Sequence, residues 1–174
     1  REDRKYWEHS NDKILKQLVL QIIAGYDTDS AANLLRHDPV LQTLMPDGHL
    51  VSQSSISRNL KRMSDETIDS FQVFNQALID KARLVRNDTN MVIDLDSTHS
   101  DTFGQQEQTA YNAHYQTTGY HPLVAFDGLT GDFLKAKLRS GNQYTSKGVK
   151  EFLEPLLEHY NQAVPTTDIL VRGD

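Results

Sequence analysis

Met91-Val92-Ile93-Asp94-Leu95-Asp96-Ser97-Thr98 is a short apolar run that carries two carboxylates. Side chains of a strand alternate between its faces, so Asp94 and Asp96 share one face while Met91, Ile93 and Leu95 share the other. Two acids on one face are costly unless something cationic compensates them. The run therefore predicts a strand whose end forms a charged site.

A second apolar run, Ile169-Leu170-Val171, is followed by Arg172-Gly173-Asp174. Two strands that each end in an aspartate suggest half of a divalent-metal site, because carboxylate oxygens are the ligands that magnesium prefers. Aspartate is also common in turns, and this simpler interpretation of Asp94 and Asp96 stays open. The Arg-Gly-Asp tripeptide occurs as an adhesion motif too, but no secretory signal in the sequence supports that interpretation.

The composition is that of an ordinary globular protein, with a formal net charge of −6 and no cysteine. The absence of cysteine excludes disulfides and thiolate metal sites. A general nucleic-acid binder is normally basic, so the net negative charge argues against one. The acidic excess lies mostly after residue 90, and such a concentration of acids is what a magnesium site requires. No apolar run approaches the roughly 20 residues of a membrane span. The first residue is Arg1 rather than methionine, and we expect the chain to be a fragment.

The first ninety residues predict helices, because their apolar residues recur at helical spacing. We expect helices over residues 12–26, 31–36, 52–63 and 64–86, and another beginning at Pro39. The apolar side of the long helix would comprise Ile68, Phe71, Phe74, Leu78, Ile79 and Leu84. The pattern changes near residues 87–90, so we place a domain boundary there. This gives an all-helical, DNA-binding module over residues 1–88 and a second domain over residues 89–174.

The segment 52–62 has two interpretations. Its polar residues are of the kinds that read a DNA groove, and Arg58, Lys61 and Arg62 would meet phosphates. Equally, it is a solvated helix that packs through Ile56, Leu60 and Met63.

The second domain predicts an α+β order. After the first strand comes a polar stretch, residues 100–119, and then a hairpin of residues 121–126 and 131–138. A helix over residues 146–160, which Pro155 should kink or interrupt, precedes the terminal strand. Gln105 and Tyr111 would contact a DNA backbone or simply belong to a polar hairpin. The histidines have none of the usual spacings of zinc ligands, and His121, which precedes a proline, is expected to be structural. His99, three residues past Asp96, is a lesser candidate for the acidic site.

Several segments, in this order, resemble the insertion-sequence transposases of the DDE class. They comprise Leu34–Pro39, Ser52–Arg58, Ile93–Thr98, Gly104–Glu107, Ala110–Asn112, Gly119–Leu123 and Arg139–Asn142. The resemblance covers residues 13–174. It implies an all-helical N-terminal module followed by a partial ribonuclease H-like α/β domain.

The resemblance also implies roles for particular residues. The first catalytic aspartate would be Asp96, which precedes the Ser-Thr pair, and the second would be Asp174. Asp94 would be a further metal ligand or a supporting acceptor. The third acid of the family, a glutamate on a later helix, has no counterpart in the chain, so we expect this fragment to be inactive.

The chemistry implied is metal-dependent cleavage and transfer of DNA strands, with two Mg²⁺ or Mn²⁺ ions in the complete protein. The implied partners are transposon ends and target DNA, bound by a homo-oligomer, and the implied location is the bacterial cytoplasm, at the nucleoid. The alternative is a non-catalytic DNA-binding or assembly module derived from a transposase.

Overall fold

The structure is a computed structural model that describes residues 9–163 and 168–173. Asp174, one of the two predicted catalytic acids, lies outside the described residues. The chain forms two compact units, residues 1–69 and 70–174. Helix α5, Asp65–Arg86, begins in the first unit and continues in the second.

The first unit consists of short helices that pack through two small apolar clusters. Its helices are α1 (Asn11–Ile23), α2 (Ala31–Leu35), α3 (Pro39–Leu44) and α4 (Gln53–Leu60), close to the predicted ranges. Asp38 caps α3 by accepting a hydrogen bond from Leu41 N at 2.9 Å, and Pro39 occupies the first turn. One cluster contains Ile14, Ala32, Val51 and Ile56, and the other Leu35, Leu41, Met45 and Leu50.

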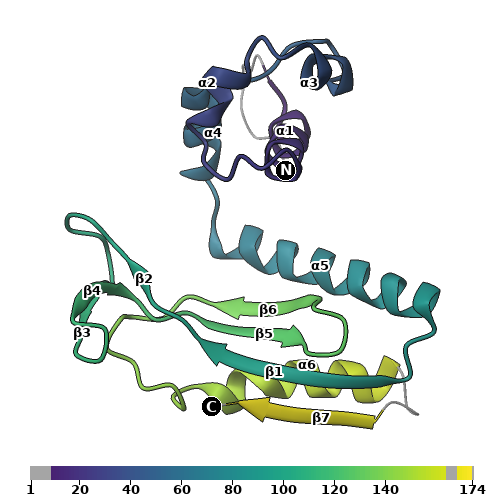
Figure 1. Ribbon diagram of the computed structural model, residues 1–174, viewed down its shortest axis with the longest axis vertical. Helices are drawn as coiled ribbons and strands as arrows, with labels where there is room; N and C mark the ends of the chain where they lie inside the picture. Colours follow the sequence, from purple (N-terminus) through teal and green to yellow (C-terminus); the bar gives the residue numbers. More distant parts are fainter. Residues whose placement is uncertain (1–8, 164–167, 174) are drawn as a thin grey trace. The chain divides into compact units, whose positions relative to one another are not determined.

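The second unit is built on a four-stranded sheet (Figure 1). Its strands are β1 (Asn90–Ser97), β5 (Leu123–Asp127), β6 (Phe133–Lys137) and β7 (Asp168–Gly173), in the order β6-β5-β1-β7. The first three form antiparallel pairs, whereas β7 is parallel to β1. The predicted hairpin and terminal strand are therefore confirmed. In the ribonuclease H-like order, three antiparallel strands are followed by a helix and then by a fourth strand that lies parallel to the first and beside it. This chain has that order, and the α+β class is confirmed.

Helix α6, Val149–Ala163, covers one face of this sheet (Figure 1). It continues through Pro155, so the predicted interruption does not occur. Met91 and Ile93 are buried against it, whereas Asp96 on the opposite face is exposed, as the alternation predicts. The core comprises Ile79, Met91, Ile93, Leu123, Ala125, Leu134, Phe152, Leu156 and Tyr160.

Helix α5 packs on the sheet through its polar side rather than through its predicted apolar side. Gln72 and Asn75 donate hydrogen bonds of 2.8 Å to the carbonyl oxygens of Leu134 and Phe133, at the edge strand β6. Of the predicted apolar side only Ile79 is buried; the exposed members are Ile68, Phe71, Phe74, Leu78 and Leu84. The prediction was wrong because an unpaired strand edge offers carbonyl oxygens, which polar side chains satisfy.

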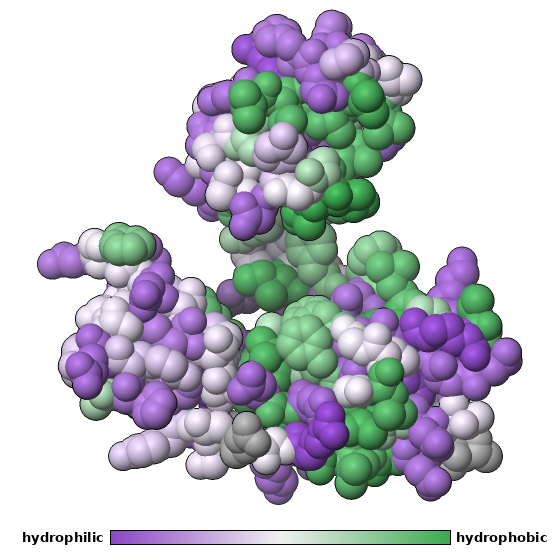
Figure 2. Space-filling model, in the orientation of Figure 1, coloured by the Kyte–Doolittle hydropathy of each residue, from purple (hydrophilic) through white to green (hydrophobic). Residues whose placement is uncertain are grey.

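A second, small sheet lies within the stretch predicted only as polar. It consists of β2 (Ser100–Asp101), β3 (Ala110–Asn112) and β4 (Thr117–Tyr120), in the order β2-β4-β3. Figure 2 shows that this part of the surface is hydrophilic, whereas apolar colour gathers over the visible face of the larger sheet. Asn112 donates a 2.7 Å hydrogen bond to Gly141 O, which attaches the loop after β6 to the small sheet.

The predicted boundary at residues 87–90 differs from the division into compact units, which falls inside α5. Residues 70–86 of α5 belong with the sheet because Ile79 joins its core and Arg83 is buried there. Within the described ranges, 9–163 and 168–173, no helix is long and apolar enough to cross a membrane.

Candidate functional site

The end of strand β1 carries the two predicted acids, and the strand β7 beside it supplies a cation. The parallel register pairs Asp94 with Arg172 and Leu95 with Gly173. Arg172 donates from Nε and Nη2 to the two oxygens of the Asp94 carboxylate, the second bond measuring 2.7 Å. This hydrogen bonding lowers the pKa of Asp94 below its usual value. The cation that the sequence requires near these acids is therefore Arg172.

The turn after β5 closes over this ion pair at Gly128. Gly128 N donates a 2.7 Å hydrogen bond to Val92 O, so the turn lies directly against β1. A Cβ atom at this position would collide with the Asp94 carboxylate and lie 3.0 Å from Arg172 Nη2. The absence of a side chain at Gly128 therefore leaves room for the pair.

Asp96 lies two residues further along the same face and is exposed. It pairs in register with Val124 of β5. Within the described part of the chain its carboxylate has no hydrogen bond or ion pair. The two acids thus differ: Asp94 is engaged by a guanidinium, whereas both oxygens of Asp96 are free to bind a ligand.

Arg139 is buried next to this strand end. Its Nη2 donates a 3.0 Å hydrogen bond to Ser97 Oγ, and Ser97 follows Asp96 directly. Its Nε donates to His121 O at 2.9 Å, and its Nη1 donates to the carbonyl oxygens of Thr145 and Lys147 at 3.1 and 2.9 Å. Burial lowers the pKa of the Arg139 guanidinium. The conformation of loop 140–148 is therefore tied to the end of β1.

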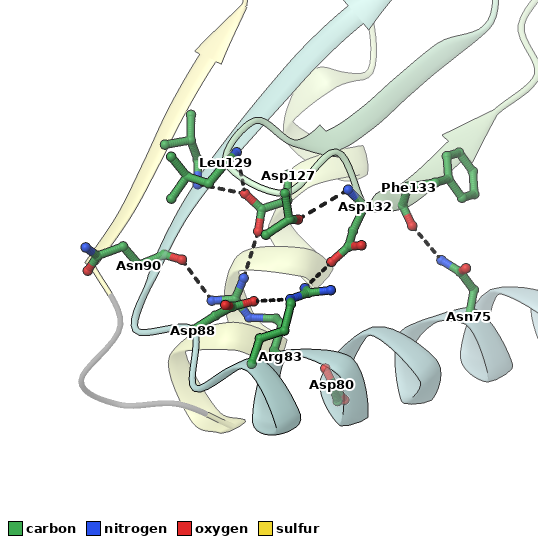
Figure 3. Close-up of polar contacts among 12 residues, drawn as sticks. Asn75, Asp80, Arg83, Asp88, Asn90, Asp127, Leu129, Asp132 and Phe133 are labelled. Atoms are coloured by element: carbon green, nitrogen blue, oxygen red, sulfur yellow. Dashed lines mark hydrogen bonds and ion pairs between the residues drawn. The ribbon is translucent and has the colours of Figure 1, made fainter.

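A buried ion pair holds the opposite end of β1 (Figure 3). Arg83 Nη1 lies 2.7 Å from Asp127 Oδ2, and Arg83 Nη2 donates to Asn90 O at 3.0 Å. Asp127 Oδ1 accepts a 3.0 Å hydrogen bond from Leu129 N in the β5–β6 turn. These contacts connect α5, β1 and β5, and they orient the strand that carries the acids.

Among the described residues, His99 and His121 have other partners than Asp94 and Asp96. His99 stacks on Tyr115 with ring centroids 4.8 Å apart, and its Nε2 lies 3.0 Å from Asp101 Oδ1. His121 is buried, with Nδ1 2.9 Å from Gln143 O, as a structural role requires. Among the residues that the structure describes, no group of three His, Cys, Asp or Glu side chains could hold a metal ion.

The predicted DNA-contacting cations lie in the first unit. Arg58 is exposed on α4, and Lys61 and Arg62 are exposed in the turn that follows. The packing predicted for this helix is partly wrong, because Leu60 is 42% exposed and Asn59 is buried in its place. The helix ends at Leu60, so the predicted spacing through residue 63 does not continue.

The other two predicted DNA contacts lie in the second unit. Gln105 is exposed in the loop before β3, and Tyr111 is exposed on β3 itself.

Sequence reasoning missed the roles of two residues of the site. Arg172 stands in the apolar run that forms β7, and its position beside the acids follows only from the pairing of β7 with β1. Arg139 lies in the segment Arg139–Asn142, where no neighbouring residue indicates that carbonyl oxygens would surround its side chain.

Comparison with known families identifies the class. The family model described as transposase DDE domain group 1 matches residues 1–174. The chain therefore belongs to the transposase DDE domain group 1 family. No curated protein matches the chain.

One solved structure is similar over much of the chain: the Mos1 transposase paired-end complex with left transposon end. The match has 11% sequence identity and a TM-score of 0.26, and covers 94% of this chain and 52% of that chain. This chain thus spans about half the length of that transposase.

Proposed function

We propose that this protein is a DNA transposase of an insertion sequence and performs metal-dependent cleavage and transfer of DNA strands. The observation that carries the proposal is the free carboxylate of Asp96 at the end of the central strand, in a chain that belongs to a transposase family throughout its length. Phosphoryl transfer needs hard oxygen ligands for divalent cations at such a position.

We assign the catalytic acids to Asp96 and Asp174. Strands β1 and β7 run in parallel with Leu95 opposite Gly173, and an aspartate follows each of these residues in the sequence. Adjacent parallel strands bring their ends to one edge of a sheet, which supports a shared site for the two carboxylates. Of the two roles considered for Asp94, the Arg172 pair favours that of a supporting acceptor over that of a metal ligand.

We propose that the ions bound at this site are Mg²⁺ or Mn²⁺, two in number. Asp96 offers unengaged oxygens, and hard cations bind such oxygens while keeping several waters. When bound, the ions supply Lewis acidity to the attacking and leaving oxygens. The protein's own contribution is to hold Asp96 on a strand that is fixed at one end by Arg83 and at the other by Arg139.

The proposed partners are transposon ends and target DNA, encountered at the bacterial nucleoid. Arg58, Lys61 and Arg62 are the proposed phosphate contacts in the first unit, and Gln105 and Tyr111 are the proposed DNA contacts in the second. We also propose that the protein acts as a homo-oligomer. Exposed Phe71, Phe74 and Leu78 recur at i, i+3 and i+7 on α5, the spacing of a helix–helix contact, and sedimentation of DNA complexes measures the state.

The substitution Asp96→Asn tests the catalytic assignment, and strand cleavage is measured beside that of the unaltered protein. The substitution keeps the shape of the side chain and removes the charge that holds a metal. We expect strand cleavage to fall by about three orders of magnitude or more, as for loss of one member of a catalytic unit. We expect the dissociation constant for DNA to change by less than about twofold, because phosphate contacts elsewhere carry binding.

Glu107→Gln is the matched control, since Glu107 is also an exposed acid of the second unit. It should cleave normally. Normal cleavage by Asp96→Asn together with loss of cleavage in Asp94→Asn would transfer the catalytic role to Asp94.

A non-catalytic DNA-binding or assembly module is the second candidate. It is favoured by the lack of a three-ligand acidic group among residues 9–163 and 168–173. DNA binding without any magnesium- or manganese-dependent cleavage would select this candidate.

A further inference from the structure

A pocket of about 420 Å³ opens between the small sheet and loop 140–148, and it reaches the end of β1. Ser97, the residue after Asp96, is part of its lining. Its volume falls in the range of small-molecule sites. The pocket lies entirely within the second unit.

The lining is aromatic and polar. Tyr111, Tyr115 and Tyr144 contribute rings, and Asn142 and Gln143 contribute amide groups. None of the described residues that line the pocket is Asp, Glu, Lys or Arg. His114 and His121 also line the pocket, and His121 is engaged through Nδ1, which lies 2.9 Å from Gln143 O. Rings and amide groups therefore dominate the lining, which suits a planar ligand with hydrogen-bonding edges.

One wall of the pocket is held by ring contacts, although its central ring, Tyr115, is 44% exposed. Tyr115 is stacked on His99 with centroids 4.8 Å apart and meets His121 edge-on at 6.1 Å. His99 supports Tyr115 from outside the lining, and its side chain is only 7% exposed. The loop that forms the opposite wall is held through Arg139, which donates to its carbonyl oxygens.

The outer rings have faces available for stacking. Tyr111 is 59% and Tyr144 is 83% exposed, so a planar ligand could cover both without displacing core contacts. Stacking on aromatic side chains is how proteins hold nucleobases that have left a duplex, whatever their sequence.

We propose that this pocket binds a single unpaired nucleobase of the DNA whose backbone passes Asp96. The proposal rests on the proposed function, because it names a subsite for the same DNA. Since Ser97 lines the pocket and adjoins Asp96, a base held there lies next to the phosphodiester to be cleaved. Tyr111 and Tyr144 stack on the base, and Asn142 and Gln143 meet its polar edges.

The test compares two fluorescein-labelled single strands of about a dozen residues, one of thymidines and one of abasic tetrahydrofuran units. Both carry the same number of phosphates, so backbone attraction is equal and the ratio of their dissociation constants reports the bases alone. The ratio is measured by fluorescence anisotropy for the complete chain and for Tyr111→Ala and Tyr144→Ala. Phe103→Ala is the matched control, because Phe103 is 89% exposed in the loop after β2 and does not line the pocket.

We expect the unaltered protein to prefer the base-bearing strand. Each tyrosine substitution should reduce this preference at least fivefold, about the lower limit for loss of one base–aromatic stack. Phe103→Ala should leave the preference unchanged. Circular dichroism of each variant confirms its fold.

Two other outcomes would contradict the base subsite, and only the second would also contradict the proposed binding of DNA. Equal binding of both strands, unaffected by the tyrosine substitutions, would remove the base subsite and leave DNA binding intact. Failure of the unaltered protein to bind either strand, or a duplex of the same length, would reject the base subsite and the DNA-binding part of the proposed function together.

Discussion

Three charged side chains near the end of β1 have three different environments. Asp94 is engaged by Arg172, Arg139 is buried among carbonyl oxygens, and Asp96 is left free. Two adjacent unpaired acids would repel each other and raise the cost of placing both on one strand face. Pairing Asp94 with Arg172 offsets that repulsion and leaves the Asp96 carboxylate available for a cation.

The Asp94–Arg172 pair should make the stability of the fold depend on pH. Because Arg172 lowers the pKa of Asp94 in the folded protein, the pair stabilises the fold above the carboxyl's unfolded-state pKa. That contribution is lost as the pH falls through the lowered folded-state pKa, below about pH 4. Carboxyl NMR should show Asp94 titrating below the usual aspartate range, and Arg172→Gln should return it toward that range. An unchanged midpoint in Arg172→Gln would mean that the pair does not persist in solution.

The acids of this site could be predicted from the sequence, but their partner could not. Alternation along β1 is a local property, and it places Asp94 and Asp96 on one face. The pairing of Asp94 with Arg172 depends on the register between β1 and β7, which join residues far apart in the chain. Register is set by tertiary packing, so no local pattern indicates that Arg172 reaches Asp94.

At the scale of elements, helix α5 is joined to the sheet by polar contacts. Arg83 and Asp127, both buried, form an ion pair whose partners also bind backbone groups of β1 and the β5–β6 turn. Removing one member of a buried pair leaves an uncompensated charge in the interior.

Arg83→Met, which keeps much of the volume, should therefore lower the free energy of unfolding by about 3–5 kcal/mol. Arg86→Ala is the control: Arg86 pairs with Asp88 and Asp132, but its side chain is 37% exposed, so its loss should lower the free energy of unfolding far less than Arg83→Met does. Urea denaturation of both variants measures the difference. Equal losses would show that burial does not set the strength of the Arg83 pair.

The helices and strands show where the periodicity of apolar residues predicts the structure and where it does not. Helices α1 to α6 and strands β1, β5, β6 and β7 follow apolar patterns or caps, which are encoded locally. The small sheet was missed because residues 100–119 have few apolar side chains, and its strands form through pairing with β4 rather than through burial. The packing side of α5 was wrong because the edge of β6 selects hydrogen-bonding side chains.

At the scale of the whole molecule, the proposed functions are divided between the two compact units. The exposed cations Arg58, Lys61 and Arg62 belong to the first unit, whereas Asp96 and the pocket belong to the second. The second unit has the greater acidic excess, so attraction for DNA must come from local groups of cations rather than from net charge.

This division predicts that the two contributions to DNA affinity are separable. Alanine at both Arg58 and Arg62 should weaken duplex binding and reduce the slope of log affinity against log salt by about one unit per lost phosphate contact. Lys16→Ala is the matched control, an exposed cation on α1 that should leave the slope unchanged.

Tyr144→Ala should change the preference for base-bearing single strands without altering this slope, because a base stack releases no counterions. Combined in one protein, the arginine and tyrosine substitutions should have effects that add in free energy, as expected for independent sites. Anisotropy titrations at several salt concentrations measure both quantities. An unchanged salt slope in the arginine variant would return α4 to a packing role. Free-energy effects of the arginine and tyrosine substitutions that do not add would mean that the cations and the pocket contact one continuous stretch of DNA as a unit.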